Sequence, residues 1–368
     1  MNRNIVNSYL GGIKTNMKGS IKVKEKLLVI ESDDWGAIRT PSKEALKKFN
    51  ENGFDLSNSV YKVDALASKT DLNLLFDLLL SVKNADGQHP IITANSIMAN
   101  PDFDKIRESD YKNYYYEPFY ETFKKYQEHH DNLELWKNGI NSNIFKPQFH
   151  GREHLNINRW MKALQSKENM VLKSFELGST YSGNGDYSYM EAYDWTEQNE
   201  VELHEIIIKE GLGIFESTFG FKSNSFIAPC YNWDSSLEPF LSQEGITCIQ
   251  GISNQLAPTG KFNCYKPINH YFGQKNTNGT IYNVRNVFFE PTSNPTIDWT
   301  DIAMARIRTA FFFNKPAVIS THRINYIGYI DSKNRDNGLL QLKKLLTKIV
   351  KKWPDIKFIT SDQLINYI

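Results

Sequence analysis

The chain has 368 residues, of which 43 are Lys or Arg and 42 are Asp or Glu, so its formal net charge is +1. This balance argues against a nucleic-acid-binding protein, which usually carries a clustered basic excess. No apolar run approaches the roughly 20 residues that span a bilayer, the amino-terminal residues lack the apolar core of a secretory signal, and the three cysteines are too scattered for a disulfide framework. We therefore expect a cytoplasmic protein with no membrane span and no nucleic-acid partner.

Short apolar runs alternate with helical patterns along the chain, which is typical of βα units around a mostly parallel sheet. The sequence predicts strands at residues 26–32, 90–95, 145–149, 175–180, 225–228, 247–250, 282–288, 317–320 and 357–360. It predicts helices at residues 42–52, 71–83, 158–166, 197–215 and 339–352. About eight strands, most of them followed by helices, favour a βα barrel over an open sheet. We treat residues 1–368 as one catalytic barrel domain, with barrel strands from about 26 to 360 and a helical, tyrosine-rich insertion at 102–142.

The first predicted strand ends in two adjacent carboxylates, Asp33 and Asp34, followed by Trp35 and Gly36. Barrel enzymes place catalytic residues at the carboxyl ends of their strands, and buried carboxylates there are costly without partners. The pair is therefore either an exposed turn or a metal ligand beside a general base. Because adjacent strand residues face opposite sides, the second interpretation requires the chain to curl at the strand end, which Trp35 and Gly36 permit.

The strand at 145–149 ends in His150 and His154, four residues apart. Two imidazoles at this spacing lie on one face of a helical turn and can reach one ion. The same residues satisfy the H-x-x-E-H string of a protease class in which Glu153 would be the general base. That class needs the string inside a helix, whereas Pro147 and the preceding apolar run place it at a strand exit. The string therefore favours a metal site or a capped surface turn.

Two later strand ends carry further candidates. Residues 225–228 are followed by Pro229, Cys230 and Tyr231, and residues 317–320 are followed by Thr321 and His322. A proline after an apolar strand fixes a bend and exposes the next backbone N–H groups, although an ordinary turn has the same sequence features. A lone histidine at a strand end is usually structural. We count His322 as a candidate catalytic residue because it is expected at the same end of the barrel as the other candidates.

These four segments, in this order, resemble the motifs of the polysaccharide deacetylases of carbohydrate esterase family four, over about residues 27–326. The resemblance implies a distorted seven- or eight-stranded (β/α) barrel. It also implies a metal-dependent hydrolase that removes an acyl group, expected to be N-acetyl, from an amino sugar or polysaccharide intermediate. The implied partner is a carbohydrate substrate.

The resemblance also implies roles for individual residues. The metal ligands would be Asp34, His150 and His154. One carboxylate and two imidazoles with open positions suit a divalent metal, most naturally Zn²⁺. Asp33 would be the general base, His322 the general acid, and the backbone N–H of Cys230 a donor to the oxyanion.

The chain departs from the family pattern at one position that matters for the base. The family normally has an arginine two residues before the proline, where this chain has Ile227. The candidates to replace it are Arg152, Arg285 and Arg323. The Asp–Trp motif of the family has only loose matches, at residues 194–195 and 298–299. Two alternatives therefore stay open: a catalytically inactive sugar-binding barrel of the same fold, and a metal hydrolase that acts on another C–N or ester bond.

Substrate contacts are expected from side chains at the same strand ends, namely Trp35, Arg152, Tyr231, Trp233 and Arg323. The insertion at 111–126 and an aromatic loop at 181–195 offer flat rings that could stack on sugars. The alternative is that these rings are buried in amphipathic helices. We expect the aromatic loop to face the site. For the insertion, both interpretations stay open.

Overall fold

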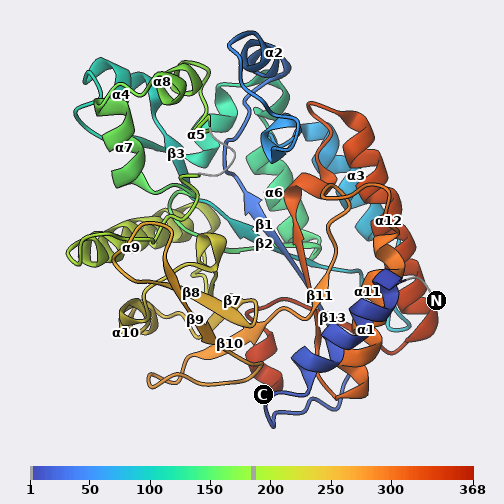
Figure 1. Ribbon diagram of the computed structural model, residues 1–368. Helices are drawn as coiled ribbons and strands as arrows, with labels where there is room; N and C mark the ends of the chain where they lie inside the picture. The colour runs from blue at the N-terminus through green and yellow to red at the C-terminus, as the bar shows by residue number, and fades with distance from the viewer. Residues whose placement is uncertain (1–2, 184–187) are drawn as a thin grey trace.

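The computed structural model describes residues 3–183 and 188–368. In these residues the main sheet has nine strands: β1 (Leu27–Trp35), β2 (Ile92–Ser96), β5 (Phe145–Phe149), β6 (Ser225–Phe226), β7 (Cys248–Gly251), β10 (Ile281–Val284), β11 (Val287–Phe288), β12 (Ala317–His322) and β13 (Lys357–Ile359). All of their pairings are parallel, in the spatial order β10-β7-β6-β5-β2-β1-β12-β11, with β13 paired to the start of β1. The sheet curls and helices cover its outer side (Figure 1). The predicted α/β class, a distorted (β/α) barrel, is confirmed.

The two end strands of the sheet, β10 and β11, are successive pieces of one segment that we predicted as a single strand. β10 pairs with β7, whereas β11 pairs with β12 on the other side of the sheet. Between them, the N–H of Arg285 donates to Gly251 O at 2.8 Å and that of Asn286 donates to Val318 O at 3.2 Å. The segment therefore links the two edges of the sheet, and Arg285, which is 1% exposed, lies at the junction.

The helices of the barrel are α1 (Arg3–Asn16), α2 (Lys43–Glu51), α3 (Lys69–Leu80), α7 (Ile157–Gln165), α8 (Asn169–Glu176), α9 (Glu200–Phe219), α10 (Glu238–Gln243), α11 (Trp299–Phe312) and α12 (Ser332–Lys352). The sequence predicted neither α1 nor α11. The predicted strand at 175–180 is wrong, because α8 occupies its first residues and buries Val171 and Phe175, four positions apart on one helix face. No helix in the described part of the chain is long and apolar enough to cross a membrane.

The insertion combines a small sheet with short helices. The hairpin-like pair β3 (Ala99–Pro101) and β4 (Tyr116–Pro118) is antiparallel, and α4 (Phe103–Glu108), α5 (Phe119–Lys124) and α6 (Asn132–Asn141) accompany it. A second antiparallel pair, β8 (Asn254–Pro258) and β9 (Tyr265–Asn269), lies outside the main sheet. Phe119 stacks on Trp136 at 5.0 Å between ring centroids, and both are fully buried. Part of the aromatic content of the insertion therefore belongs to the core.

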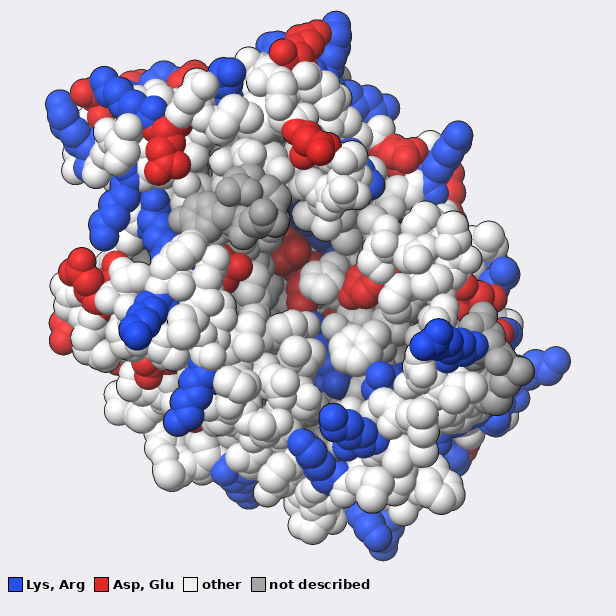
Figure 2. Space-filling view, viewed as in Figure 1, with Lys and Arg blue, Asp and Glu red and all other residues white. Residues whose placement is uncertain are grey.

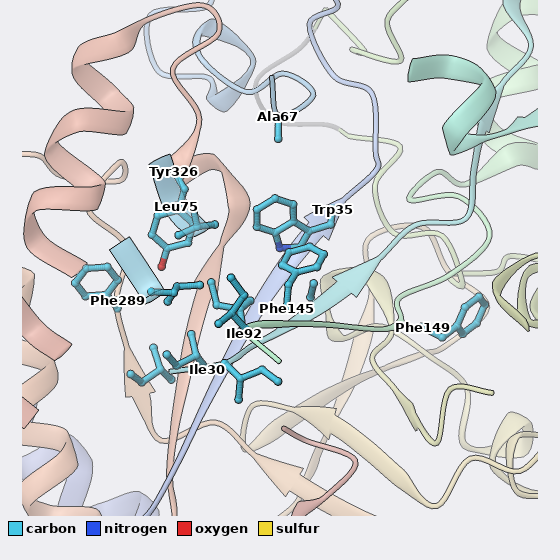
Figure 3. Packing of buried hydrophobic residues seen from close by; sticks show 14 of the residues in the cluster. Ile30, Trp35, Ala67, Leu75, Ile92, Phe145, Phe149, Phe289 and Tyr326 are labelled. Carbon is cyan, nitrogen blue, oxygen red and sulfur yellow. The ribbon is translucent and has the colours of Figure 1, made fainter. Parts of the chain in front are cut away.

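The main hydrophobic core lies between the sheet and its helices. Ile30, Ile92 and Phe145 come from three neighbouring strands, and Leu75 of α3 packs against them (Figure 3). Trp35, at the end of β1, meets Phe145 edge-on at 5.0 Å between ring centroids. Burial of these large side chains anchors the carboxyl end of β1, which carries the adjacent carboxylates.

Candidate active site

The end of β1 curls where the sequence required it to. Asp34 has φ of 72°, in the left-handed region that residues other than glycine seldom adopt. The register between β1 and β2 shifts between Ser32 and Trp35 at the same point. Asp33 remains in register with His322 on β12. Both carboxylates consequently lie at the carboxyl ends of the strands, beside one cavity.

Asp34, His150 and His154 converge on one point. The Nε2 atoms of His150 and His154 each lie 3.3 Å from Asp34 Oδ1, and the three candidate ligand atoms are all within 4.8 Å of one another. His150 Nδ1 lies 2.9 Å from the carbonyl oxygen of Ile227. Because a carbonyl only accepts, Nδ1 carries the proton and Nε2 keeps its lone pair for a ligand bond. One carboxylate and two imidazoles fit a divalent metal, so this group could hold one.

The protonation states of the group agree with a ligand role. Burial lowers the pKa of His154 well below its usual value, and the Asp34 charge only partly opposes this. Burial raises the pKa of the Asp34 carboxyl, but the imidazoles of His154 and His150 and the charge of Arg39 outweigh it, so that pKa falls well below its usual range. A neutral imidazole and an ionised carboxylate are the forms that bind metals.

Asp33 is held by Arg285 in a two-pronged contact. Arg285 Nη1 donates to Asp33 Oδ2 and Nη2 donates to Oδ1, both at 2.6 Å, and Asn95 Nδ2 donates to Oδ1 at 2.8 Å. Burial raises the pKa of Asp33, but the charge and hydrogen bonds of Arg285 outweigh it and hold the pKa at about 2. Of the three arginines that could replace the one missing at Ile227, the structure brings Arg285 to the carboxylate.

His322 faces Asp33 across the mouth of the barrel. Its Nε2 lies 3.8 Å from Asp33 Oδ2, and its Nδ1 donates to Glu290 Oε1 at 2.7 Å. Asn325 holds the other oxygen of Glu290 at 2.7 Å. Burial lowers the pKa of His322, but the Glu290 charge and hydrogen bond and the nearby aspartates raise it well above its usual value. His322 is thus an imidazolium whose Nε2–H faces the carboxylate.

Sequence reasoning missed Glu290, Asn95 and Asn325. Glu290 lies two residues past β11, so the rule that located Asp33 and His322 at strand ends would have found it too. The loose Asp–Trp candidates lie elsewhere: Asp194 pairs with Arg159 at 2.6 Å, and Asp298 caps α11. Asn95 gives no signal in the sequence, because its contact with Asp33 spans 62 positions.

The segment after β6 turns through a short 3-10 helix, η3 (Pro229–Tyr231). Cys230 and Tyr231 both have positive φ, of 54° and 56°. The backbone N–H of Cys230 donates to none of the residues that the structure describes, whereas that of Tyr231 donates to Ala228 O. Burial raises the pKa of the Cys230 thiol, so the backbone of this residue, and not its sulfur, is the group available for chemistry.

These groups share a cavity of about 700 Å³. The predicted site residues that line it are Asp33, Asp34, His150, His154, Cys230, Tyr231 and His322. Aliphatic side chains, among them Val60, Val63 and Ile252, form much of the remaining wall. Figure 2 shows a hollow near the centre of this face with acidic side chains at its floor. Charged groups at the base and an apolar wall are common features of small-molecule sites.

Two of the expected substrate contacts are wrong, because the side chains are buried in the core. Trp35 is 1% exposed, and its indole N–H donates to Ser32 Oγ at 3.0 Å. Trp233 is 2% exposed, and its indole N–H donates to Glu238 Oε1 at 3.2 Å. Neither lines the cavity. A tryptophan with its ring packed and its N–H paired has no surface left for a substrate.

The two expected arginine contacts are engaged elsewhere. Arg152 Nε donates to Glu153 at 2.8 Å, and its Nη1 pairs with Glu210. Arg323 is 1% exposed and pairs with Asp64 at 3.1 Å. Neither lines the cavity, so a substrate contact from either is wrong. The buried pair of Arg152 and Glu153, outside any helix, also removes the protease interpretation of the H-x-x-E-H string.

The aromatic segments do not face the metal group as expected. In the loop at 181–195, residues 184–187 lie outside the described residues, and among the rest only Met190 lines the cavity. Tyr181 packs on Tyr61 at 4.7 Å between ring centroids, and Tyr193 is 1% exposed. No tyrosine of the insertion lines the cavity. The expectation for the described part of the loop is therefore wrong, since these rings fill cores.

No family model matches the chain, and no curated protein matches it. Among solved structures, a protein described as a polysaccharide deacetylase from Mycobacterium smegmatis has a TM-score of 0.48 at 9% identity, over 95% of this chain and 94% of the other. A 4-alpha-glucanotransferase from Thermococcus litoralis has a TM-score of 0.46 at 8% identity, over 95% of this chain and 41% of the other. A pseudoenzyme of carbohydrate esterase family four from Bacillus anthracis has a TM-score of 0.35 at 11% identity, over 90% of this chain and 63% of the other. At these scores the likeness carries no weight for the chemistry, which rests on the residues of this chain.

Proposed function

We propose that this protein is a metal-dependent hydrolase that removes an acyl group, N-acetyl above all, from an amino sugar or a polysaccharide intermediate. One observation carries the proposal. A single cavity brings together a possible metal-binding group, a carboxylate fixed by an arginine and an imidazolium fixed by a glutamate. A ligand set, a base and an acid at one place are the parts that metal-assisted hydrolysis of an amide requires.

Asp34, His150 and His154 would hold the metal, for which Zn²⁺ suits the nitrogen and oxygen donors. A divalent ion bound there would polarise the acyl carbonyl and make a water molecule more acidic. His150 is oriented for this by its hydrogen bond to Ile227 O at 2.9 Å.

Asp33 would accept the proton of the attacking water on Oδ2. Oδ1 already accepts hydrogen bonds from Arg285 and Asn95, whereas Oδ2 accepts one from Arg285 and faces His322 at 3.8 Å. Arg285 prevents the carboxylate from rotating and keeps it ionised at every working pH, since the pKa of Asp33 is about 2.

His322 would donate its Nε2 proton to the leaving nitrogen, because an amide nitrogen cannot leave unprotonated at a useful rate. Glu290, 2.7 Å from Nδ1, keeps the ring charged and fixes its orientation. The N–H of Cys230 would stabilise the oxyanion, and a donor of this kind contributes about 3 kcal/mol.

The inactive alternative rested on the missing arginine at Ile227. Arg285 supplies the contact to the base from the junction of β10 and β11, so the observation that favoured an inactive barrel disappears. An ester or another C–N bond as the substrate would use the same groups, and a panel of substrates separates these cases.

The test is release of carboxylic acid from N-acetylated amino-sugar oligomers and from O-acetylated sugars, before and after chelation and after return of one equivalent of Zn²⁺. We expect metal-dependent acetate release from the N-acetyl substrates. Acetate release from the O-acetyl substrates alone would show that the protein is an esterase and not an amide hydrolase. No release from either class by a fully metallated protein would overturn the proposal.

A further inference from the structure

The first helix presents its apolar side chains to solvent. Val6, Leu10 and Ile13 of α1 and Met17, one residue past its end, recur at spacings of four, three and four residues, so they form one stripe. They are 37%, 60%, 37% and 66% exposed. Phe312, in the last turn of α11, is 80% exposed. Scattered exposed apolar residues are normal, but a continuous stripe along one helix marks an interaction surface.

The opposite face of α1 is small and polar, and it packs against α11 and the junction of β10 and β11. Ser8 Oγ donates to Ile302 O at 2.8 Å, and buried Asn16 accepts from Asn286 Nδ2 at 2.8 Å. A Cβ on Gly12 would lie 2.1 Å from Thr309 Oγ1, so α1 and α11 pack too closely at this point for any residue larger than glycine. The helix cannot rotate its apolar stripe inward without breaking these contacts.

The charge around the stripe has one sign. Residues 3–24 contain five basic side chains and no Asp or Glu, although the whole chain is nearly neutral. The basic residues are Arg3, Lys14, Lys18, Lys22 and Lys24. All five are exposed, and none pairs with a carboxylate among the described residues. In Figure 2, Lys and Arg side chains are prominent at the lower right of the face, the region that α1 occupies in Figure 1.

We propose that α1 docks this protein on an anionic lipid surface, with the apolar stripe in the headgroup layer and the lysines on lipid phosphates. A helix with an apolar face and a lysine-rich border is the form that binds membrane interfaces, and each basic residue near an anionic leaflet contributes about 1 kcal/mol. A second copy of the chain fits less well, because two such helices would bring their unpaired cations together.

The stripe on α1 does not overlap the cavity. Both α1 and the central hollow are visible on the face shown in Figures 1 and 2. No residue of the stripe lines the cavity, so the docking surface and the candidate active site are separate parts of the molecule. The docking itself does not depend on the proposed activity.

Co-sedimentation of the full chain with vesicles tests the proposal without turnover. We expect binding to vesicles of phosphatidylglycerol and phosphatidylcholine that weakens as salt is raised, and little binding to phosphatidylcholine alone. In the double variant Leu10→Gln with Met17→Gln, the partition coefficient should fall at least about tenfold. Ile206→Gln on α9, where the side chain is 55% exposed, is the matched control and should bind as the parent does.

Thermal unfolding shows whether the double variant is folded, since both side chains point to solvent and their loss should leave the melting temperature unchanged. Lys14→Glu with Lys18→Glu should weaken binding to anionic vesicles while the apolar stripe stays intact. Absence of binding to anionic vesicles, or equal binding by the folded double variant, would overturn the proposal. So would a concentration-dependent dimer in sedimentation velocity that the double variant abolishes, because the stripe would then bind a second copy.

Discussion

Two neighbouring carboxylates acquire different properties from their partners. Asp33 and Asp34 follow each other in the chain, but Arg285 grips the first, whereas His150 and His154 face the second. The positive φ of Asp34 turns its side chain away from the arginine and toward the imidazoles. One residue with a positive φ is therefore enough to give two adjacent aspartates different partners, one suited to a general base and the other to a metal ligand.

Arg285 should be important for stability as well as for the base. It is fully buried between Glu31 and Asp33, and the variant Arg285→Met leaves two buried carboxylates without a cation. We expect the free energy of unfolding at pH 7 to fall by about 3–5 kcal/mol, measured by denaturant titration. Arg285→Lys keeps the charge, loses the two-pronged contact and should cost less.

The pH dependence of this effect has a definite sign. Because the pKa of Asp33 is about 2 in the folded chain, below the value of about 3.9 for an unperturbed aspartate, its stabilisation is present above pH 4 and is lost as pH falls toward 2. Arg285→Met should remove that contribution. Equal unfolding free energies for parent and Arg285→Met at pH 7 would contradict the role of Arg285.

Glu290 should set the alkaline limit of activity. The pKa of His322 lies well above its usual value, chiefly because the Glu290 carboxylate opposes the effect of burial, so the acid stays protonated at neutral pH. Activity should fall as pH rises through that pKa. Glu290→Gln removes the charge, lowers the pKa of His322 and should shift the alkaline limb of the rate profile to lower pH. An unshifted limb with a reduced rate would leave Glu290 a purely structural role.

At the scale of elements, the strands of the main sheet and the residues at their carboxyl ends could be predicted from the sequence. Apolar runs identified most of the strands because parallel strands are buried on both faces. Side chains just beyond those runs then gave Asp33, Asp34, His150, His154 and His322. Helix α11 was missed because it buries residues on several sides, among them Thr300, Ala305 and Thr309, so no clear helical stripe remains.

Contacts between distant segments could not be predicted. The bond from Arg285 to Asp33 joins positions 252 apart, and nothing local distinguishes this arginine from Arg152 or Arg323. The prediction that Trp35 and Trp233 contact the substrate was wrong for a related reason. The sequence does not show whether a side chain near a strand end points into the core or into the cavity. Trp35 was assigned to the substrate and fills the core.

The contact between α12 and the 3-10 helix η5 (Arg323–Tyr326) offers a test at this scale. A Cβ on Gly338 would lie 1.7 Å from Asn325 O, and Asn325 holds Glu290. Gly338→Ala should therefore displace η5, destabilise the fold by about 1–3 kcal/mol and reduce activity. Gly213→Ala, on α9 with no atom within 4 Å of the added Cβ, is the control and should be neutral or stabilising by up to about 1 kcal/mol. Equal effects of the two substitutions would argue against this contact as a support of the acid.

At the scale of the whole molecule, the site joins segments from most of the chain. The candidate ligands come from the ends of β1 and β5, the base is held from the junction of β10 and β11, and the acid follows from β12. A ligand that binds only this arrangement stabilises the folded state by mass action.

Metal binding should therefore raise the melting temperature. With Zn²⁺ at 100 times its dissociation constant, the gain is about 2.7 kcal/mol, or roughly 3–4 °C for a chain of 368 residues. Differential scanning fluorimetry of chelated and metallated protein measures the shift, and His154→Ala should abolish it. A shift of equal size in His154→Ala would place the metal elsewhere.

The most direct test of the central claim measures bound metal and acetate release on the same preparations of the parent, Asp33→Asn and Asp34→Ala. The parent should bind one equivalent of metal and release acetate from an N-acetylated amino-sugar oligomer. Asp33→Asn should keep the metal and lose at least about a hundredfold in rate, whereas Asp34→Ala should lose both. Full activity in Asp33→Asn, or a full equivalent of metal in Asp34→Ala, would contradict the assignment of base and ligand.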